Sequence, residues 1–119
     1  MSDKPVVWMG QSKKDHLDMP DAVQDALGHA LSEAQKGRTF HRAAPMKGDL
    51  RDVTEVRVNH ESDAYRMMFT TELPGVVYVL HVFKKKSKRG LQTPREEIDR
   101  ITERLKRVRT LKQSGASQA

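Results

Sequence analysis

The stretch from Gly75 to Pro94 places the strongest constraint on how this chain of 119 residues folds. It opens with VVYVLHVF at residues 76–83, whose β-branched, aliphatic and aromatic content is typical of a strand covered on both faces. The basic run KKKSKR follows at residues 84–89. Cations held at the end of a rigid strand can meet a polyanion in a fixed geometry, which favours a binding site. Taken alone, the run is equally consistent with a solvated loop.

The positive charge of the chain is concentrated in its last third. The formal net charge is +6, and residues 84–112 hold 12 Lys and Arg against 4 Asp and Glu, whereas the rest of the chain holds 10 against 12. Such a one-sided field is typical of a protein that binds nucleic acid or an acidic protein partner.

Composition predicts one folded domain. Hydrophobic residues make up 36% of the chain and charged residues 32%, and because the apolar residues recur periodically we expect a fold rather than disorder. We expect a single domain over residues 1–112 and a flexible tail over residues 113–119. The chain has no cysteine, which excludes disulfides and thiolate metal sites. It has no apolar segment of membrane-spanning length, so we expect a cytoplasmic protein without a membrane partner.

Hydrophobic periodicity predicts helices at both ends of the chain and strands between them. Three helices are expected, at residues 12–19, 20–37 and 93–112. Ser12 and Thr93 are expected to open capping boxes, and Gly37 is expected to end the second helix. Four strands are expected, at residues 4–9, 53–60, 65–73 and 76–83. Residues 38–50 are expected to form a surface loop.

The second and third strands are predicted to form a hairpin. Matching their apolar faces sets Val56 opposite Met67, or shifts the pairing by two residues. In the simplest register Arg57 lies directly across from Arg66. Two like charges side by side on a sheet are unfavourable unless something compensates them. Glu55, on the same face, can do so, and a bound phosphate can do so equally well.

A tight turn at residues 73–76 is predicted to set which face each residue of the last strand occupies. Pro74 and Gly75 suit a type II turn. The resulting pairing places three residues on the face covered by the N-terminal helices: Tyr78, Leu80 and Val82. It places five on the face that carries the arginines: Val77, Val79, His81, Phe83 and Lys85.

The residue inventory favours phosphate binding over other chemistry. The five histidines show no i,i+4 pairing, so no metal site is predicted, and the chain has neither a phosphate-cradling Gly-rich motif nor a GxSxG elbow. What remains is a set of cations expected on one sheet face or beside it: Lys47, Arg57, Arg66, His81, Lys84, Lys85 and Lys86.

RNA is a substrate that such a cationic face can cleave without a metal or cofactor. The 2′-hydroxyl is the nucleophile, so the protein must align it, stabilise charge on the phosphoryl oxygens and assist proton transfer. Arginine suits the charge term because its fork meets two oxygens at once. Tyr65 and His81 have proton-transfer chemistry, although a core tyrosine and a half-buried strand histidine are the alternative interpretations.

Several motifs, taken in this order and spacing, are shared with a known group. They are Lys47-Gly48, Glu55-Val56-Arg57, Tyr65-Arg66, residues 79–83, Lys85-Lys86-Ser87, Thr93-Pro94 and Glu97-Ile98. With these motifs the chain resembles the RelE/HigB toxins of bacterial type II toxin–antitoxin systems, in particular their phage-derived branch. The likeness extends from about Val6 to Arg107.

The resemblance implies a fold, an activity and a partner. The fold is a small α+β domain with a four-stranded antiparallel or mixed sheet, two N-terminal helices on one face and a C-terminal helix. The activity is endoribonuclease cleavage of mRNA on the ribosome, and the partner is a cognate antitoxin, expected to be a HigA-like DNA-binding protein. The expected catalytic residues are Arg57, Arg66 and Lys85, which match positions in the group, and His81, which is chosen for its proton-transfer chemistry and matches no general base of the group. The expected RNA-binding residues are Lys47 and Lys86, which also match the group, and Lys84, Lys88 and Arg89, which belong to the basic run.

Two other functions agree with the same sequence. The related ParE toxins share the fold but inhibit DNA gyrase, so the fold alone does not fix the target. A basic module that binds RNA without cleaving it is the second alternative.

Overall fold

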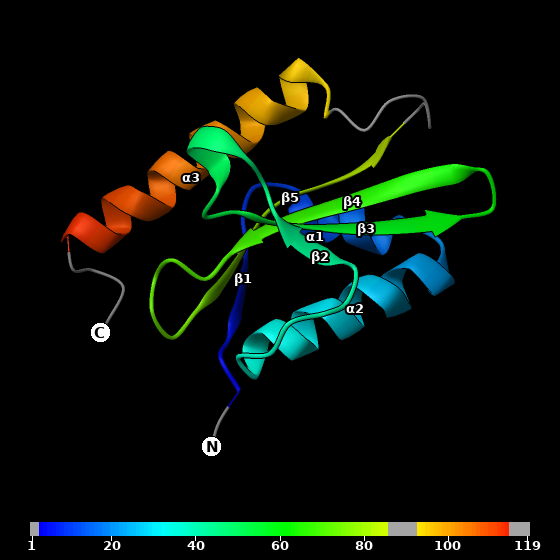
Figure 1. Cartoon of the computed structure of the whole chain (residues 1–119), viewed down its shortest axis with the longest axis horizontal. Coiled ribbons are helices and arrows are strands. Elements are labelled where there is room, and N and C mark those ends of the chain that lie inside the picture. Colours follow the sequence, from blue (N-terminus) through cyan, green and yellow to red (C-terminus); the bar gives the residue numbers. More distant parts are fainter. Residues whose placement is uncertain (1–2, 86–92, 115–119) are drawn as a thin grey trace.

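The chain forms a mixed five-stranded sheet with α2 and α3 on opposite faces (Figure 1). The computed structural model describes residues 3–85 and 93–114. The elements in chain order are β1 (Val6–Trp8), α1 (Ser12–Leu17), α2 (Asp21–Gln35), β2 (Ala43–Pro45), the 3₁₀ turn η1 (Gly48–Leu50), β3 (Thr54–His60), β4 (Asp63–Thr70), β5 (Val77–Lys85) and α3 (Arg95–Ser114). The predicted α+β class is confirmed.

The sheet separates two apolar clusters, one under each helix. The apolar stripe of α2, which includes Val23 and Leu27, packs on Val56, Met67 and other residues of one sheet face. On the opposite face, α3 packs through Ile101, Leu105 and Val108, together with Met68, Tyr78 and Leu80 of the sheet. Burial of these stripes anchors both helices. Within the described residues, no helix is both long and apolar enough to cross a membrane.

In the part of the chain that the structure describes, the sheet has five strands, so the expectation of four was wrong. The order is β1-β5-β4-β3-β2, with β1 parallel to β5 and the other neighbours antiparallel. The additional strand, β2, lies within residues 38–50, which were expected to be a loop throughout. A strand of three residues has no readable alternation, and Pro45 is tolerated in it because β2 is an edge strand.

The register of the β3–β4 hairpin is confirmed. Val56 pairs with Met67, and Arg57 pairs with Arg66. The turn before β5 also has the expected form, since Gly75 has a φ of +83°, a value that type II turns require at this position.

A β-bulge divides β5 into two halves that differ in which residues face α3. Met68 pairs with His81 but Phe69 pairs with Val79, so Leu80 has no partner on β4. Beyond the bulge, His81, Phe83 and Lys85 share the face of Arg66, as expected. Before it the pattern is inverted, so the predicted faces of four residues were wrong: Tyr78 and Leu80 lie on the α3 side, and Val77 and Val79 lie on the α2 side.

The helix ends show which capping predictions were correct. Gly37, with a φ of +76°, ends α2, and the N–H groups of Gly37 and Arg38 donate to the carbonyls of Ala34 and Glu33. The capping box at Ser12 was wrong: its hydroxyl donates to the Val79 carbonyl at 3.5 Å, which ties α1 to the sheet.

Candidate functional site

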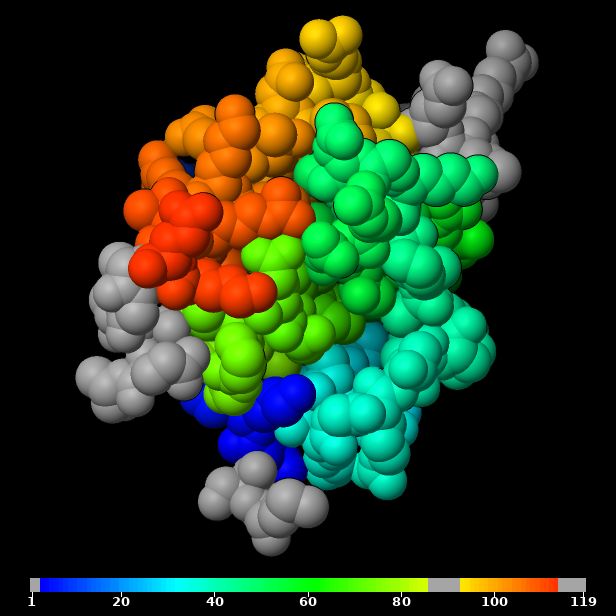
Figure 2. Space-filling view, turned by 60° about the vertical axis from the view of Figure 1, so that its left-hand side comes forward, coloured from blue at the N-terminus to red at the C-terminus, as the bar shows by residue number. Residues whose placement is uncertain are grey.

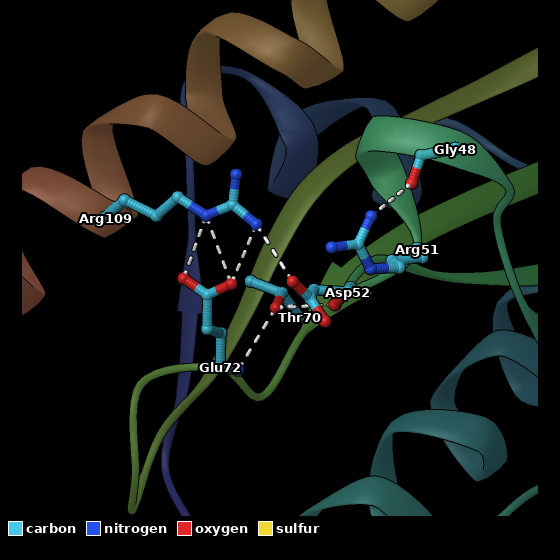
Figure 3. A network of polar contacts seen from close by, with 6 residues as sticks. All are labelled: Gly48, Arg51, Asp52, Thr70, Glu72 and Arg109. Carbon is cyan, nitrogen blue, oxygen red and sulfur yellow. Dashed lines mark hydrogen bonds and ion pairs between the residues drawn. The ribbon is translucent and has the colours of Figure 1, made fainter.

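Helix α3 covers the sheet face on which the cationic site was expected, so that face is not an open surface. A polar cluster fastens the C-terminal half of the helix (Figure 3). The Arg109 guanidinium donates to both carboxylate oxygens of Glu72 and to Asp52, at 3.0–3.1 Å. The Arg109 contact lowers the pKa of the Glu72 carboxyl, so the pair stays charged. The Thr70 hydroxyl completes the cluster by donating to the Asp52 carbonyl.

Three arginines lie side by side across β2, β3 and β4, and we call them the arginine row. Arg57 on β3 pairs with Arg66 on β4. Arg42 immediately precedes β2, and its carbonyl accepts a hydrogen bond from the Arg57 N–H at 3.3 Å. Arg42, Arg57 and Asn59 line one shallow depression on the surface. The arginine row therefore runs from the open edge of the sheet to its interior.

One buried glutamate compensates the inner part of the row. Glu55 Oε1 accepts from Arg57 Nε at 2.9 Å, and Arg66 Nε lies 3.5 Å from Glu55 Oε2. Oε2 is buried and accepts no hydrogen bond from the described residues. The exposed fraction of the side chain is 7% for Arg66 and 44% for Arg57. One carboxylate therefore faces two guanidinium groups, and the positive charge left over is presented to solvent by the more exposed of the two, Arg57.

Electrostatics agree with this division of roles. Burial lowers the pKa of Arg66, Glu55 raises it, and the neighbouring Arg57 lowers it. Arginine is the most basic of the side chains, so Arg66 remains a cation. Because Arg66 is buried and Arg57 is half-exposed, an anion that approaches this pair meets Arg57 first.

A cleft of about 720 Å³ opens beside Arg57, between β3, residues 45–50 and the first turns of α3. Figure 2 shows the green segment that contains β2 and η1 lying against the yellow-orange start of α3, as it does in Figure 1. The charged residues that line the cleft are Lys47, Asp49, Glu55 and Arg57, and the other lining residues are mainly apolar. The cleft therefore offers space for a ligand next to the solvent-facing arm of Arg57.

His81 is enclosed under α3 and does not line this cleft. Its Nε2 lies 2.9 Å from Glu97 Oε1, and Arg104 Nη1 approaches its Nδ1 at 3.4 Å. Since Arg104 can only donate, Nδ1 is the acceptor and Nε2 carries the hydrogen given to Glu97. Burial lowers the pKa of His81, Glu97 raises it, and Arg104 lowers it further. The imidazole is therefore held neutral, with both nitrogens occupied.

The structure separates the other predicted site residues into three groups. Lys47 is exposed at the cleft and Arg57 lies beside it. Lys85 is buried on the face of Arg66, and Lys84 is exposed in an ion pair with Asp63. The remaining residues, Lys86, Lys88 and Arg89, lie outside the described residues. Among those described, no group of three or more His, Cys, Asp or Glu could hold a metal ion.

Arg42, Met46 and Asp49 belong to the site and were not among the predicted site residues. Arg42 and Asp49 lie in the segment assigned to a loop, where no alternation shows which way a side chain points. The only available signal was the position of this segment immediately before the predicted hairpin, since neighbours in sequence often become neighbours in a sheet.

Comparison with known proteins supports a family assignment. A family model described as "Phage derived protein Gp49-like (DUF891)" matches residues 14–106, which confirms the resemblance to a phage-derived family seen in the motifs. Among solved structures, the toxin–antitoxin complex RelBE2 from Mycobacterium tuberculosis is similar, with 14% identity over 73% of this chain and 97% of that chain and a TM-score of 0.49. That likeness is too distant to transfer the role of any residue. No curated protein sequence matches the chain.

Proposed function

The chain belongs to the Gp49-like family of phage-derived proteins, and from this membership and the arginine row we propose that it is the toxin of a type II toxin–antitoxin system. Its proposed activity is that of an endoribonuclease that cuts mRNA on the ribosome. The observation that supports the activity best is the row itself: Arg57 and Arg66 are paired on adjacent strands with one carboxylate, Glu55, between them, and Arg42 lines the same depression as Arg57.

Arg57 is proposed to bind the scissile phosphate. Its Nε donates to Glu55, and its two terminal nitrogens make no hydrogen bond to the described residues, so they can meet two phosphoryl oxygens. Arg42 and Lys47 lie on either side of it and are exposed, which suits contacts to the flanking phosphates. Single-stranded RNA is commonly tracked by a cationic groove of this kind.

The proposed reaction needs no metal. The 2′-oxygen attacks the adjacent phosphorus, the bond from phosphorus to the 5′-oxygen breaks, and the products are a 2′,3′-cyclic phosphate and a 5′-hydroxyl. The 2′-hydroxyl loses one proton and the leaving 5′-oxygen gains one, so the reaction balances. Arg57 stabilises the charge that grows on the phosphoryl oxygens.

Arg66, His81 and Lys85 are proposed to act from inside the protein. Arg66 offsets Glu55 and so positions Arg57, which makes it a positioning residue. His81 and Lys85 are buried on the same sheet face as Arg66, and they are proposed to support the row from within the protein. The exposed cations of α3 are proposed to receive an acidic segment of the cognate antitoxin, for which a HigA-like DNA-binding protein is the expected type.

Growth and enzyme assays on the intact chain test the proposal. Induction of the wild-type chain should arrest growth, RNA cut on ribosomes should end in a 2′,3′-cyclic phosphate, and gyrase supercoiling should be unaffected. Growth arrest with inhibited supercoiling and intact RNA would contradict the proposal in favour of a gyrase inhibitor. RNA binding without cleavage would contradict the proposed endoribonuclease activity and support a module that only binds RNA.

A further inference from the structure

The cleft beside Arg57 combines two kinds of lining. Arg57, Glu55 and Lys47 contribute charged side chains. Met46, which follows β2, and Ile98, on α3, contribute apolar side chains. A ligand with an anionic group and a flat, apolar-faced group matches this combination, and a nucleotide has both. The volume of about 720 Å³ is within the range of small-molecule sites.

The lining of the cleft also includes hydrogen-bond acceptors. Asp49 is exposed at the cleft, and its carboxylate makes no ion pair or hydrogen bond within residues 3–85 and 93–114. The Thr102 hydroxyl donates to the Ile98 carbonyl at 2.8 Å, so its oxygen faces the cleft only as an acceptor. A base that enters the cleft is therefore selected for its hydrogen-bond donors.

We infer that the cleft also holds the base of the nucleotide whose phosphate Arg57 binds, and that Asp49 makes guanine the preferred base. The inference rests on the proposed function and extends it to the choice of substrate. Guanine presents two adjacent donors, N1–H and N2–H, which a carboxylate accepts together. Adenine and cytosine present one amino group each, and uracil presents one N–H. The side chains of Met46 and Ile98 cover the two faces of the ring.

Titration with free nucleotides tests the base site without requiring catalysis. Purified chain is titrated with 5′-GMP, AMP, CMP and UMP while amide chemical shifts are followed by NMR. GMP should bind about tenfold more tightly than UMP, the discrimination that one good bidentate contact provides. The shifts should centre on Met46, Asp49 and Thr102. Asp49→Asn should reduce GMP binding to the level of UMP, and Asp25→Asn, on the exposed side of α2, should not.

Met46→Ser provides a second, independent test. This variant removes one wall of the cleft but keeps Asp49, so it should weaken all four nucleotides by a similar factor and leave the preference for GMP intact. Equal binding of the four nucleotides by wild type, or a GMP preference that survives in Asp49→Asn, would overturn the inference.

The two proposals fail separately. RNA cleavage that depends on Arg57 but shows no preference for GMP would overturn the base site and leave the proposed function standing. A GMP preference that depends on Asp49, in a chain that cuts no RNA, would support the base site and overturn the proposed function.

Discussion

Arg57 and Arg66 lie directly opposite one another on adjacent strands and share a single buried carboxylate, that of Glu55. Two like charges in this arrangement repel, and the buried one cannot be screened by water. The folded protein therefore depends on Glu55 to compensate the two paired arginines. Its loss should affect stability before it affects activity.

Replacement of Glu55 by Gln should destabilise the fold strongly. The change keeps the shape of the side chain but leaves Arg66 as an uncompensated buried cation, so we expect a loss of about 3 kcal/mol in the free energy of unfolding. Urea denaturation followed by circular dichroism measures it.

The double variant Glu55→Gln/Arg66→Met identifies the cause. With the buried cation also removed, most of the lost stability should return, because the half-exposed Arg57 remains solvated. If the double variant is as unstable as the sum of the two single variants, the account of a compensated buried charge is incorrect.

The contribution of Arg42 to RNA binding should appear in its salt dependence. Each phosphate contact to single-stranded nucleic acid contributes about 0.7 to the slope of log K against log salt. Arg42→Ala should therefore lower the magnitude of the slope by about this amount, measured by fluorescence anisotropy with a short RNA. Arg38→Ala is the matched control, since Arg38 is an exposed arginine just after α2, on the opposite side of the sheet, paired with Glu33. Equal slopes for the two variants would place Arg42 outside the RNA path.

The stability of the protein should fall as the solution becomes mildly acidic. Burial lowers the pKa of His16, whose ring lies 5.2 Å from that of Trp8 and whose Nδ1 is buried without a hydrogen bond among the described residues. Burial lowers the pKa of His81 as well. The unfolded chain then binds protons more readily than the folded chain does. The contribution of these two histidines to the free energy of unfolding is therefore fully present above about pH 6.5 and is lost as the pH falls toward their folded-state pKa values.

The variant His16→Phe isolates the contribution of His16 to the pH dependence of stability. The variant keeps an aromatic ring against Trp8 and removes the titrating group, so its free energy of unfolding should depend less on pH between about 7 and 5 than that of wild type. The exposed His41→Gln serves as the control for loss of a histidine. An unchanged pH profile in His16→Phe would show that His16 does not contribute to the acid sensitivity.

Gly10 is the position at which a methyl group should be most damaging. Its φ is +56°, and a Cβ there would lie 2.5 Å from Arg104 Nη2. Arg104 in turn holds the β5 bulge by donating to the Leu80 carbonyl at 2.7 Å. Gly10→Ala should therefore cost about 1–3 kcal/mol from backbone strain, with a further loss from displacement of Arg104.

Gly28→Ala is the contrasting change. Gly28 lies in α2 with nothing within 4 Å of an added Cβ, so alanine should stabilise the protein by up to about 1 kcal/mol. Thermal unfolding of both variants compares them directly. Similar effects of the two substitutions would remove the special role assigned to the contact between Gly10 and Arg104.

Where apolar and polar residues alternate along a strand, the sequence predicted which face each residue occupies. Where they do not alternate, it could not. The opposition of Arg57 and Arg66 followed from matching two apolar faces, because a shift by one residue would have exposed the core. The bulge at Leu80 leaves no such signal, since β5 is apolar on both faces and either direction is acceptable for each residue. Helix α3 was expected to dock by its apolar stripe, but no pattern specified which face of the sheet it would cover.

The most direct test of the central claim is a map of RNA 5′ ends on translating ribosomes after induction of Arg57→Ala and Arg38→Ala. The account predicts that wild type and Arg38→Ala generate new 5′-hydroxyl ends within coding sequences, and that Arg57→Ala, folded as judged by circular dichroism, generates about a hundredfold fewer, the scale expected for removal of one charge-stabilising donor. New ends of equal abundance and position in Arg57→Ala and wild type would contradict the account.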